Sequence, residues 1–135
     1  MPAVTAYQML IDGQWVDASD GARYDSVDPA TGDVWATMPE ATSEDVDRAV
    51  RAAEAAGISG EWAGMTPTER GRCLRRLGDL LADASENLGR IETRDTGKMF
   101  KETRWQAKYI AEYFYFYAGA ADKIEGRTLP IDKPD

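Results

Sequence analysis

The sequence contains no histidine and a single cysteine, Cys73. These absences exclude a Ser-His-Asp triad, a Cys-His pair, a zinc cluster and an internal disulfide. A lone thiol is typical of a reducing compartment, and the start Met1-Pro2-Ala3 lacks the basic and apolar regions of a secretory signal. We therefore expect a cytoplasmic protein.

Long hydrophobic runs and an excess of positive charge are also missing. No apolar run approaches the roughly 20 residues that span a bilayer. Lys and Arg number 16 against 24 Asp and Glu, which gives a net charge of −8. That charge repels nucleic acid and anionic membranes, so we expect neither as a partner. The arginines at positions 70, 72, 75 and 76 are surrounded by acidic residues and are interpreted as a solvated helix face.

What is present is the composition of one ordinary globular domain, with 135 residues, 43% apolar and 30% charged. The first part of the chain carries strand and turn signals. Asp12-Gly13 between two short apolar runs predicts a hairpin with a type I′ turn. Residues 24–27 and 34–38 are predicted to be strands on either side of a turn at 28–32.

From residue 42 onward the hydrophobic period is that of a helix. The spacing predicts a first helix from a Thr42 cap to Gly57, followed by a loop at 57–64. A second helix begins at Thr66-Pro67, where a cap and a proline at the first helical position coincide. Ser85-Glu86-Asn87 divides that run into two helices, of which the second ends at Gly97.

The last predicted helix, Phe100 to Ile124, is unusually aromatic, with aromatic residues at five consecutive positions, 113–117. Five successive residues step through about 400°, so no single face can carry them. Such a helix needs a larger body around it than the rest of the chain provides. We therefore expect residues 1–135 to form one incomplete domain, with residues 127–135 extended like the start of an unpaired strand.

Several segments, taken in order, resemble the N-terminal portion of the aldehyde dehydrogenase superfamily. Each segment alone is weak, but the ordered set is specific. The resemblance covers nearly the whole chain and rests on Ile11–Val16, Asp28–Asp33, Pro39–Ala41, Glu69-Arg70, Glu92–Lys98, Phe116–Lys123 and Gly126–Pro130.

The resemblance implies an α/β fold: the N-terminal part of a three-layer architecture, with a short hairpin and strands, three or four helices and an unpaired C-terminal strand. Residues 1–135 would be one partial cofactor-binding domain, and residues 127–135 the start of the oligomerisation strand. The family forms homo-oligomers. Its members oxidise an aldehyde by attack of a Cys thiolate, hydride transfer to NAD or NADP, and hydrolysis by water activated by a Glu.

None of that catalytic machinery is expected in these residues. Cys73 lies beside Leu74 on a predicted apolar stripe, which indicates a buried, unreactive thiol, and it does not match the family's cysteine. Gly57, Gly60 and Gly64 have the wrong context for a phosphate-binding loop. We assign no catalytic or cofactor-binding residue, expect neither NAD nor NADP to bind this chain alone, and expect the chain alone to be inactive.

The resemblance does imply two other sites. A Na⁺ or K⁺ ion would be held by Asp95 and by the backbone carbonyls of Ser26 and Val27; the alternative is that Asp95 caps a helix or pairs locally with Lys98. Trp105, Tyr109 and Tyr113 share a helix face near the positions that line the family's substrate tunnel, where aromatics accept an apolar or cationic aldehyde. The alternative for these three is core packing.

Two functions therefore compete. In the first, the chain is the N-terminal segment of an aldehyde dehydrogenase, and its partners are the remainder of the fold, a homo-oligomer and an aldehyde substrate. In the second, the chain is a non-catalytic binding module, or one piece of a split enzyme, that docks through its aromatic helix and open strand.

Overall fold

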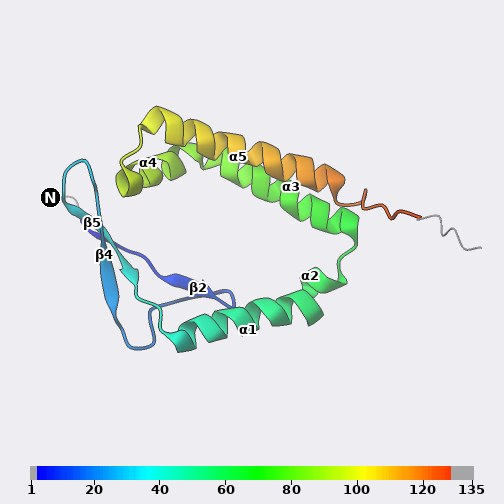
Figure 1. Ribbon diagram of the computed structural model, residues 1–135, viewed down its shortest axis with the longest axis horizontal. Helices are drawn as coiled ribbons and strands as arrows, with labels where there is room; N and C mark the ends of the chain where they lie inside the picture. Colours follow the sequence, from blue (N-terminus) through cyan, green and yellow to red (C-terminus); the bar gives the residue numbers. More distant parts are fainter. Residues whose placement is uncertain (1–2, 129–135) are drawn as a thin grey trace, which may run out of the picture.

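The computed structural model describes residues 3–128, which form five strands and five helices in two layers (Figure 1). The helices α3, α4 and α5 lie together in one layer, and α1 lies with the strands in the other. The strands are β1 Thr5–Ala6, β2 Met9–Ile11, β3 Gln14–Val16, β4 Arg23–Val27 and β5 Val34–Pro39. The helices are α1 Ser43–Ser59, α2 Glu61–Gly64, α3 Pro67–Asp83, α4 Ser85–Thr96 and α5 Phe100–Ala120.

The strands form two small sheets. β2 and β3 pair antiparallel, and positive φ angles at Asp12 (51°) and Gly13 (73°) confirm the predicted type I′ turn. The second sheet has the order β1-β5-β4, with β1 parallel and β4 antiparallel to β5. Strand β1 was not predicted, because two residues are too few to show a period.

Helix α1 starts at the predicted cap but ends later than predicted. Thr42 and Asp45 form a reciprocal capping box, and the helix runs through Gly57 to Ser59. A glycine ends a helix when it takes the left-handed conformation, and Gly57 does not have a positive φ. The chain instead leaves the helix at Gly60 in an extended conformation, and the expected loop contains the short helix α2.

The α3–α5 layer is held together by close backbone approach. A Cβ atom built on Gly71 would lie 2.7 Å from Ala118 O, and one on Gly78 would lie 2.6 Å from Tyr115 Cε1. On α4, a Cβ on Gly89 would lie 2.7 Å from Arg104 Cα. These glycines bring α3 and α4 against α5. The predicted division into two helices is confirmed, but the break is at Ala84, and Ser85-Glu86-Asn87 form the first turn of α4.

Helix α5 ends at Ala120 rather than at the predicted Ile124. Ile124 is 90% exposed, so another turn of helix would bury nothing, and unpacked helical turns are marginal in water. Arg127 and Thr128 lie outside any strand, and the remainder of the predicted C-terminal strand lies outside the described residues. Within residues 3–128 no helix is both long and apolar enough to cross a membrane.

The prediction that Cys73 is a buried core residue is wrong. Cys73 is exposed, and its Sγ lies 4.0 Å from Met65 Sδ. The residues of α3 that are buried are Gly71 and Gly78, and the half-buried Leu74 and Leu81 of the predicted stripe lie on the same face of the helix. Leu77 is 41% exposed.

Candidate functional site

The candidate cation residues come together where β4 meets the end of α4. Ser26 Oγ donates a hydrogen bond to Asp95 Oδ1 at 2.6 Å, and Val27 follows Ser26 at a bulge in the strand. Gly97, with φ 74°, ends α4 and leaves room for Pro29, because a Cβ at Gly97 would lie 2.8 Å from Pro29 Cγ. The turn after β4 is thereby packed on the C-terminal end of α4.

The alternative in which Asp95 pairs with Lys98 is wrong. Lys98 Nζ lies 2.8 Å from Glu92 Oε1, and Asp95 bonds Ser26 instead. No group of three or more Asp, Glu, His or Cys side chains among the described residues could hold a metal ion. A cation at this place would therefore rely on one carboxylate, Asp95, with neutral oxygens, a donor set that suits a monovalent ion.

The candidate tunnel residues form an aromatic ladder along α5, one helical turn apart. The Trp105 and Tyr109 rings are stacked, with centroids 4.9 Å apart and 10° between their planes. The Tyr109 and Tyr113 rings meet edge to face at 5.7 Å and 88°. Such pairs are worth about 0.5–1.5 kcal/mol beyond their buried area.

The ladder lies on the exposed side of α5 and takes no part in the packing among the described residues. The buried residues of α5 are Thr103, Ala107 and Ala111. Each rung of the ladder is displaced from one of these by two residues, or about 200° around the helix. Trp105, Tyr109 and Tyr113 are 61%, 46% and 57% exposed.

Two surface hollows follow the ladder. One, of about 770 Å³, surrounds Trp105, and basic side chains line it. The other, of about 280 Å³, is lined by Glu112 with four aromatic residues, Tyr109, Tyr113, Phe116 and Tyr117. Aromatic faces beside one carboxylate suit an apolar or cationic group.

A polar link between α3 and α5 was missed by the sequence analysis. Tyr115 Oη donates to Asp79 Oδ1 at 2.9 Å, and Arg75 Cζ lies 5.4 Å from the centre of the Tyr115 ring. The hydrogen bond to Asp79 raises the pKa of Tyr115, because the acceptor carboxylate favours the protonated phenol. The 36-residue separation leaves no local signal for this contact.

The glycines considered for a phosphate loop follow no strand. Gly57 is inside α1, Gly60 joins α1 to α2, and Gly64 ends α2. None of the three has a positive φ. A dinucleotide-binding loop connects a strand to a helix and uses glycine conformations of that kind, so these residues do not fit a nicotinamide dinucleotide.

Comparison with known proteins gives a consistent result. The model of the aldehyde dehydrogenase family matches residues 15–135. The chain is 48% identical over 129 residues to (Z)-2-((N-methylformamido)methylene)-5-hydroxybutyrolactone dehydrogenase of Acinetobacter baylyi, covering 96% of this chain and 26% of that protein.

Solved structures agree. An NAD-dependent aldehyde dehydrogenase from Sinorhizobium meliloti superposes with a TM-score of 0.88 and 37% identity, over 93% of this chain and 25% of that one. A betaine aldehyde dehydrogenase variant from Staphylococcus aureus, in complex with NAD⁺, gives a TM-score of 0.85 and 37% identity, over 95% of this chain and 26% of that one. The chain thus spans about a quarter of the length of these relatives.

Proposed function

This chain belongs to the aldehyde dehydrogenase family, and we propose that it forms the N-terminal part of an NAD(P)-dependent enzyme that oxidises aldehydes to carboxylic acids. The observation that carries the proposal is the family match over residues 15–135. The α/β fold, with short strands followed by the α3–α5 layer, superposes on the same quarter of solved family members.

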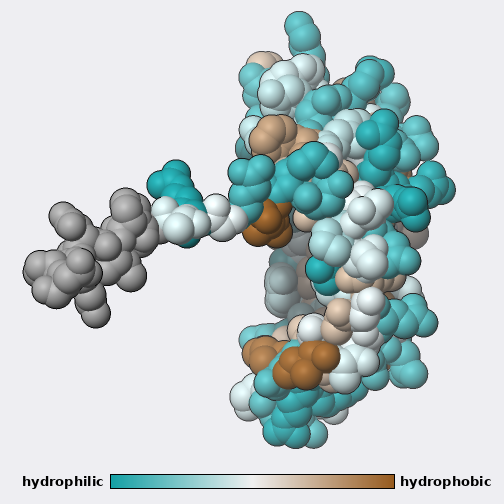
Figure 2. Space-filling model, turned by 90° about the vertical axis from the view of Figure 1, so that its right-hand side faces the viewer, coloured by the Kyte–Doolittle hydropathy of each residue, from teal (hydrophilic) through white to brown (hydrophobic). Residues whose placement is uncertain are grey.

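The exposed apolar surface supports a role as part of a larger fold. Val46, Val50 and Ile58 on α1 are 54%, 59% and 71% exposed. Figure 2 shows hydrophobic side chains at the surface at the level of α1. We propose that the rest of the enzyme covers these surfaces.

The nicotinamide cofactor supplies hydride acceptance in this family. Because Gly57, Gly60 and Gly64 do not fit it, we assign cofactor binding and the reacting thiol to other parts of the enzyme. Cys73 is exposed in α3. Because it does not match the family's cysteine, we give it no catalytic role. By this proposal the 135-residue chain alone binds neither NAD nor NADP and does not turn over.

The contribution of this chain to the reaction is to orient the substrate. We propose that Trp105, Tyr109 and Tyr113 form one wall of the substrate tunnel. Glu112 lines the second hollow with Tyr109 and Tyr113 and suits a cationic or apolar aldehyde there, whereas basic side chains line the hollow at Trp105. The structural relative named as a betaine aldehyde dehydrogenase is consistent with this class.

We propose three further properties. Asp95, Ser26 and Val27 hold a Na⁺ or K⁺ ion, in keeping with the contact between Ser26 and Asp95. The complete enzyme is a homodimer or homotetramer that begins its oligomerisation strand at residues 127–135. The single cysteine is in keeping with a cytoplasmic location.

A second candidate function is a docking module or one piece of a split enzyme. The exposed α5 aromatics favour it, because Phe116 and Tyr117 are 70% and 60% exposed in addition to the ladder. In this case the chain would form a stable complex with a second chain that supplies the missing part of the fold. Persistent monomeric behaviour of the isolated chain, without binding of hydrophobic dyes, would count against docking.

A chimaera tests the main proposal. Residues 1–135 replace the matching quarter of the Acinetobacter relative, and aldehyde-dependent NADH formation is measured for the chimaera, for the isolated 135-residue chain and for the relative without that quarter. We expect turnover only from the chimaera. Turnover by the isolated chain, free of contaminating enzyme, would overturn the assignment of chemistry to other residues, and a folded but inactive chimaera would favour the docking function.

A further inference from the structure

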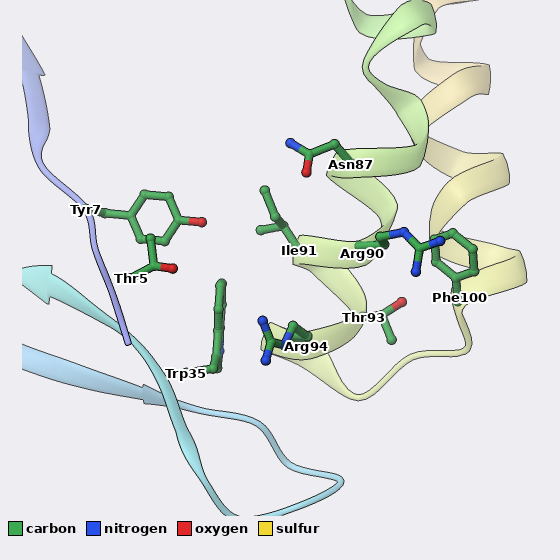
Figure 3. Close-up of a pocket in the computed structure, with 9 residues that line it drawn as sticks. All are labelled: Thr5, Tyr7, Trp35, Asn87, Arg90, Ile91, Thr93, Arg94 and Phe100. Atoms are coloured by element: carbon green, nitrogen blue, oxygen red, sulfur yellow. The ribbon is translucent and has the colours of Figure 1, made fainter. Parts of the chain in front are cut away.

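A cavity of about 600 Å³ lies between the strands and α4 and extends to Phe100 at the start of α5 (Figure 3). Thr5, Tyr7 and Trp35 form its wall on the strand side. Ile91, Asn87 and Arg94 face them from α4. The volume lies within the range of about 300–1,000 Å³ that small-molecule sites occupy. Neither the tunnel residues nor the Ser26–Asp95 pair lines this cavity.

The charge of the cavity is opposite to that of the chain. Among the described residues no Asp or Glu lines it, although the sequence has 24 of them, and two arginines do. Arg90 is already engaged: it forms an ion pair with Glu86 at 2.9 Å and lies 4.7 Å from the centre of the Phe100 ring. Figure 3 shows its guanidinium directed toward Phe100 and away from Trp35.

Arg94, one helical turn further along, has no such partner. No carboxylate within residues 3–128 lies within ion-pair distance of its guanidinium, which stands 5.7 Å from the centre of the Trp35 ring. Figure 3 shows the guanidinium directed toward the strand-side wall. Asp28 and Asp33 line a neighbouring hollow that shares Arg94 and Trp35, but neither carboxylate is within ion-pair distance of the guanidinium. A cation that is held over an aromatic ring without a paired carboxylate attracts an anion to the same place.

The aromatic part of this wall is formed by Trp35 and Tyr7. Trp35 is 6% exposed, and its indole Nε1 is buried, so a ligand in the cavity does not reach that N–H. Tyr7, whose ring meets the Trp35 ring edge to face at 6.1 Å, adds an apolar surface beside Arg94.

We propose that this cavity binds a small planar carboxylate. Its carboxylate pairs with the guanidinium of Arg94 beside Trp35, and its flat apolar body lies between Tyr7 and Ile91. Charge-assisted pairing with a guanidinium sets the orientation, and the aromatic wall selects a flat molecule over a compact anion. The site is separate from the aldehyde oxidation proposed above and does not depend on it.

Benzoate is the probe that tests this site, with the intact protein that carries this chain. The tryptophans are labelled with 5-fluorotryptophan, and the Trp35 fluorine resonance is assigned by its loss in Trp35→Phe. We expect benzoate to shift that resonance saturably. Arg94→Gln should raise the half-saturating concentration by at least about tenfold, the effect of losing one charge-assisted hydrogen bond.

Arg51→Gln is the matched control, because it removes an equal charge outside the cavity, from a guanidinium that is paired with Asp47. It should change half-saturation by no more than about twofold. An equal loss in Arg51→Gln would mean general electrostatic attraction and would overturn the site. So would an equal shift with benzyl alcohol, which lacks the charge, or with inorganic phosphate at matched ionic strength, which lacks the flat body. Absence of any saturable shift would overturn it as well.

Discussion

Ser26 and Asp95, 69 positions apart in the sequence, are joined by a 2.6 Å hydrogen bond that ties β4 to the last turn of α4. This bond brings the carboxylate to the strand position whose carbonyl, with that of Val27, is proposed to hold a monovalent cation. Asp95 is exposed, so the hydrogen bond alone contributes little to stability. Its importance lies in fixing the direction of the carboxylate.

Replacement of Asp95 tests the cation directly. With the ion proposed here, K⁺ or Na⁺ should raise the melting temperature relative to choline chloride at equal ionic strength, because an ion that binds only the folded state stabilises it. Asp95→Asn should abolish that difference while keeping the shape of the side chain. Ser26→Ala removes the hydroxyl but no carbonyl and should retain most of it. A cation effect that survives in Asp95→Asn would contradict the site.

The approach of α4 to α5 predicts a severe effect of Gly89→Ala. The new Cβ would lie 2.7 Å from Arg104 Cα and 2.8 Å from Arg104 N, which are backbone atoms that cannot move aside separately. Overpacking of this kind costs about 1–3 kcal/mol, measured as a lower midpoint of urea unfolding. Gly57→Ala is the control: nothing lies within 4 Å of its Cβ, so alanine should stabilise α1 by up to about 1 kcal/mol. Equal destabilisation by both would contradict the packing.

The N-terminal cap of α3 predicts a smaller effect. Thr66 Oγ1 accepts a hydrogen bond from Glu69 N at 3.3 Å, and Thr66 N donates to Glu69 Oε2 at 2.7 Å. Thr66→Ala should lower the free energy of unfolding by about 1 kcal/mol. Thr68→Ala, at an exposed position in the first turn of the same helix, should lie near zero. A loss in Thr68→Ala as large as in Thr66→Ala would contradict the role of the cap, because alanine is the better helix former and should not destabilise the helix at that position.

Asp45 predicts part of the acid sensitivity. Backbone N–H groups of Ser19 and Thr42, each 3.0 Å from Oδ2, hold the pKa of Asp45 below its ordinary value of 3.8. A lowered folded-state pKa stabilises the protein above the unfolded value, and this contribution is lost as the pH falls below about 4 through the folded-state value. In Asp45→Asn the loss of stability below about pH 4 should therefore be smaller. The measurement is the urea midpoint of unfolding as a function of pH. A midpoint that falls as steeply below about pH 4 in Asp45→Asn as in the unmodified protein would contradict the assignment.

Local signals were enough for most of the secondary structure. The hairpin at Asp12-Gly13 and the caps at Thr42 and Thr66 depend on residues within three positions of one another, and all three predictions are confirmed. The end of α1 was missed because a glycine permits a left-handed turn without requiring one, and Gly57 stays helical.

The errors in burial have a different cause. The periodicity of α3 put Cys73 in the core, whereas α3 approaches α5 through Gly71 and Gly78, and a glycine carries no weight in a hydrophobic pattern. The Trp35–Arg94 contact joins segments far apart in the sequence, so no periodicity indicates it. The resemblance to a known family named the residues Ser26 and Asp95, but the structure was needed to show that they touch.

The aromatic ladder carries the last prediction, which requires the active chimaera. Tyr109 is the middle rung, in contact with both Trp105 and Tyr113, and its ring is one of those that line the hollow beside Glu112. Tyr109→Ala should raise KM for a cationic or apolar aldehyde by about tenfold, since an aromatic contact of about 1–2 kcal/mol is removed. It should change kcat little, because the ring positions substrate and does not touch the reacting atoms.

Tyr109→Phe should keep KM within about twofold, because it keeps the ring. Tyr24→Ala, at a strand residue that is 54% exposed and far along the chain from α5, is the control for loss of an exposed tyrosine and should leave KM unchanged. A fall in kcat with constant KM in Tyr109→Ala would contradict a positioning role and would place the ladder at the reacting atoms or in the stability of the fold.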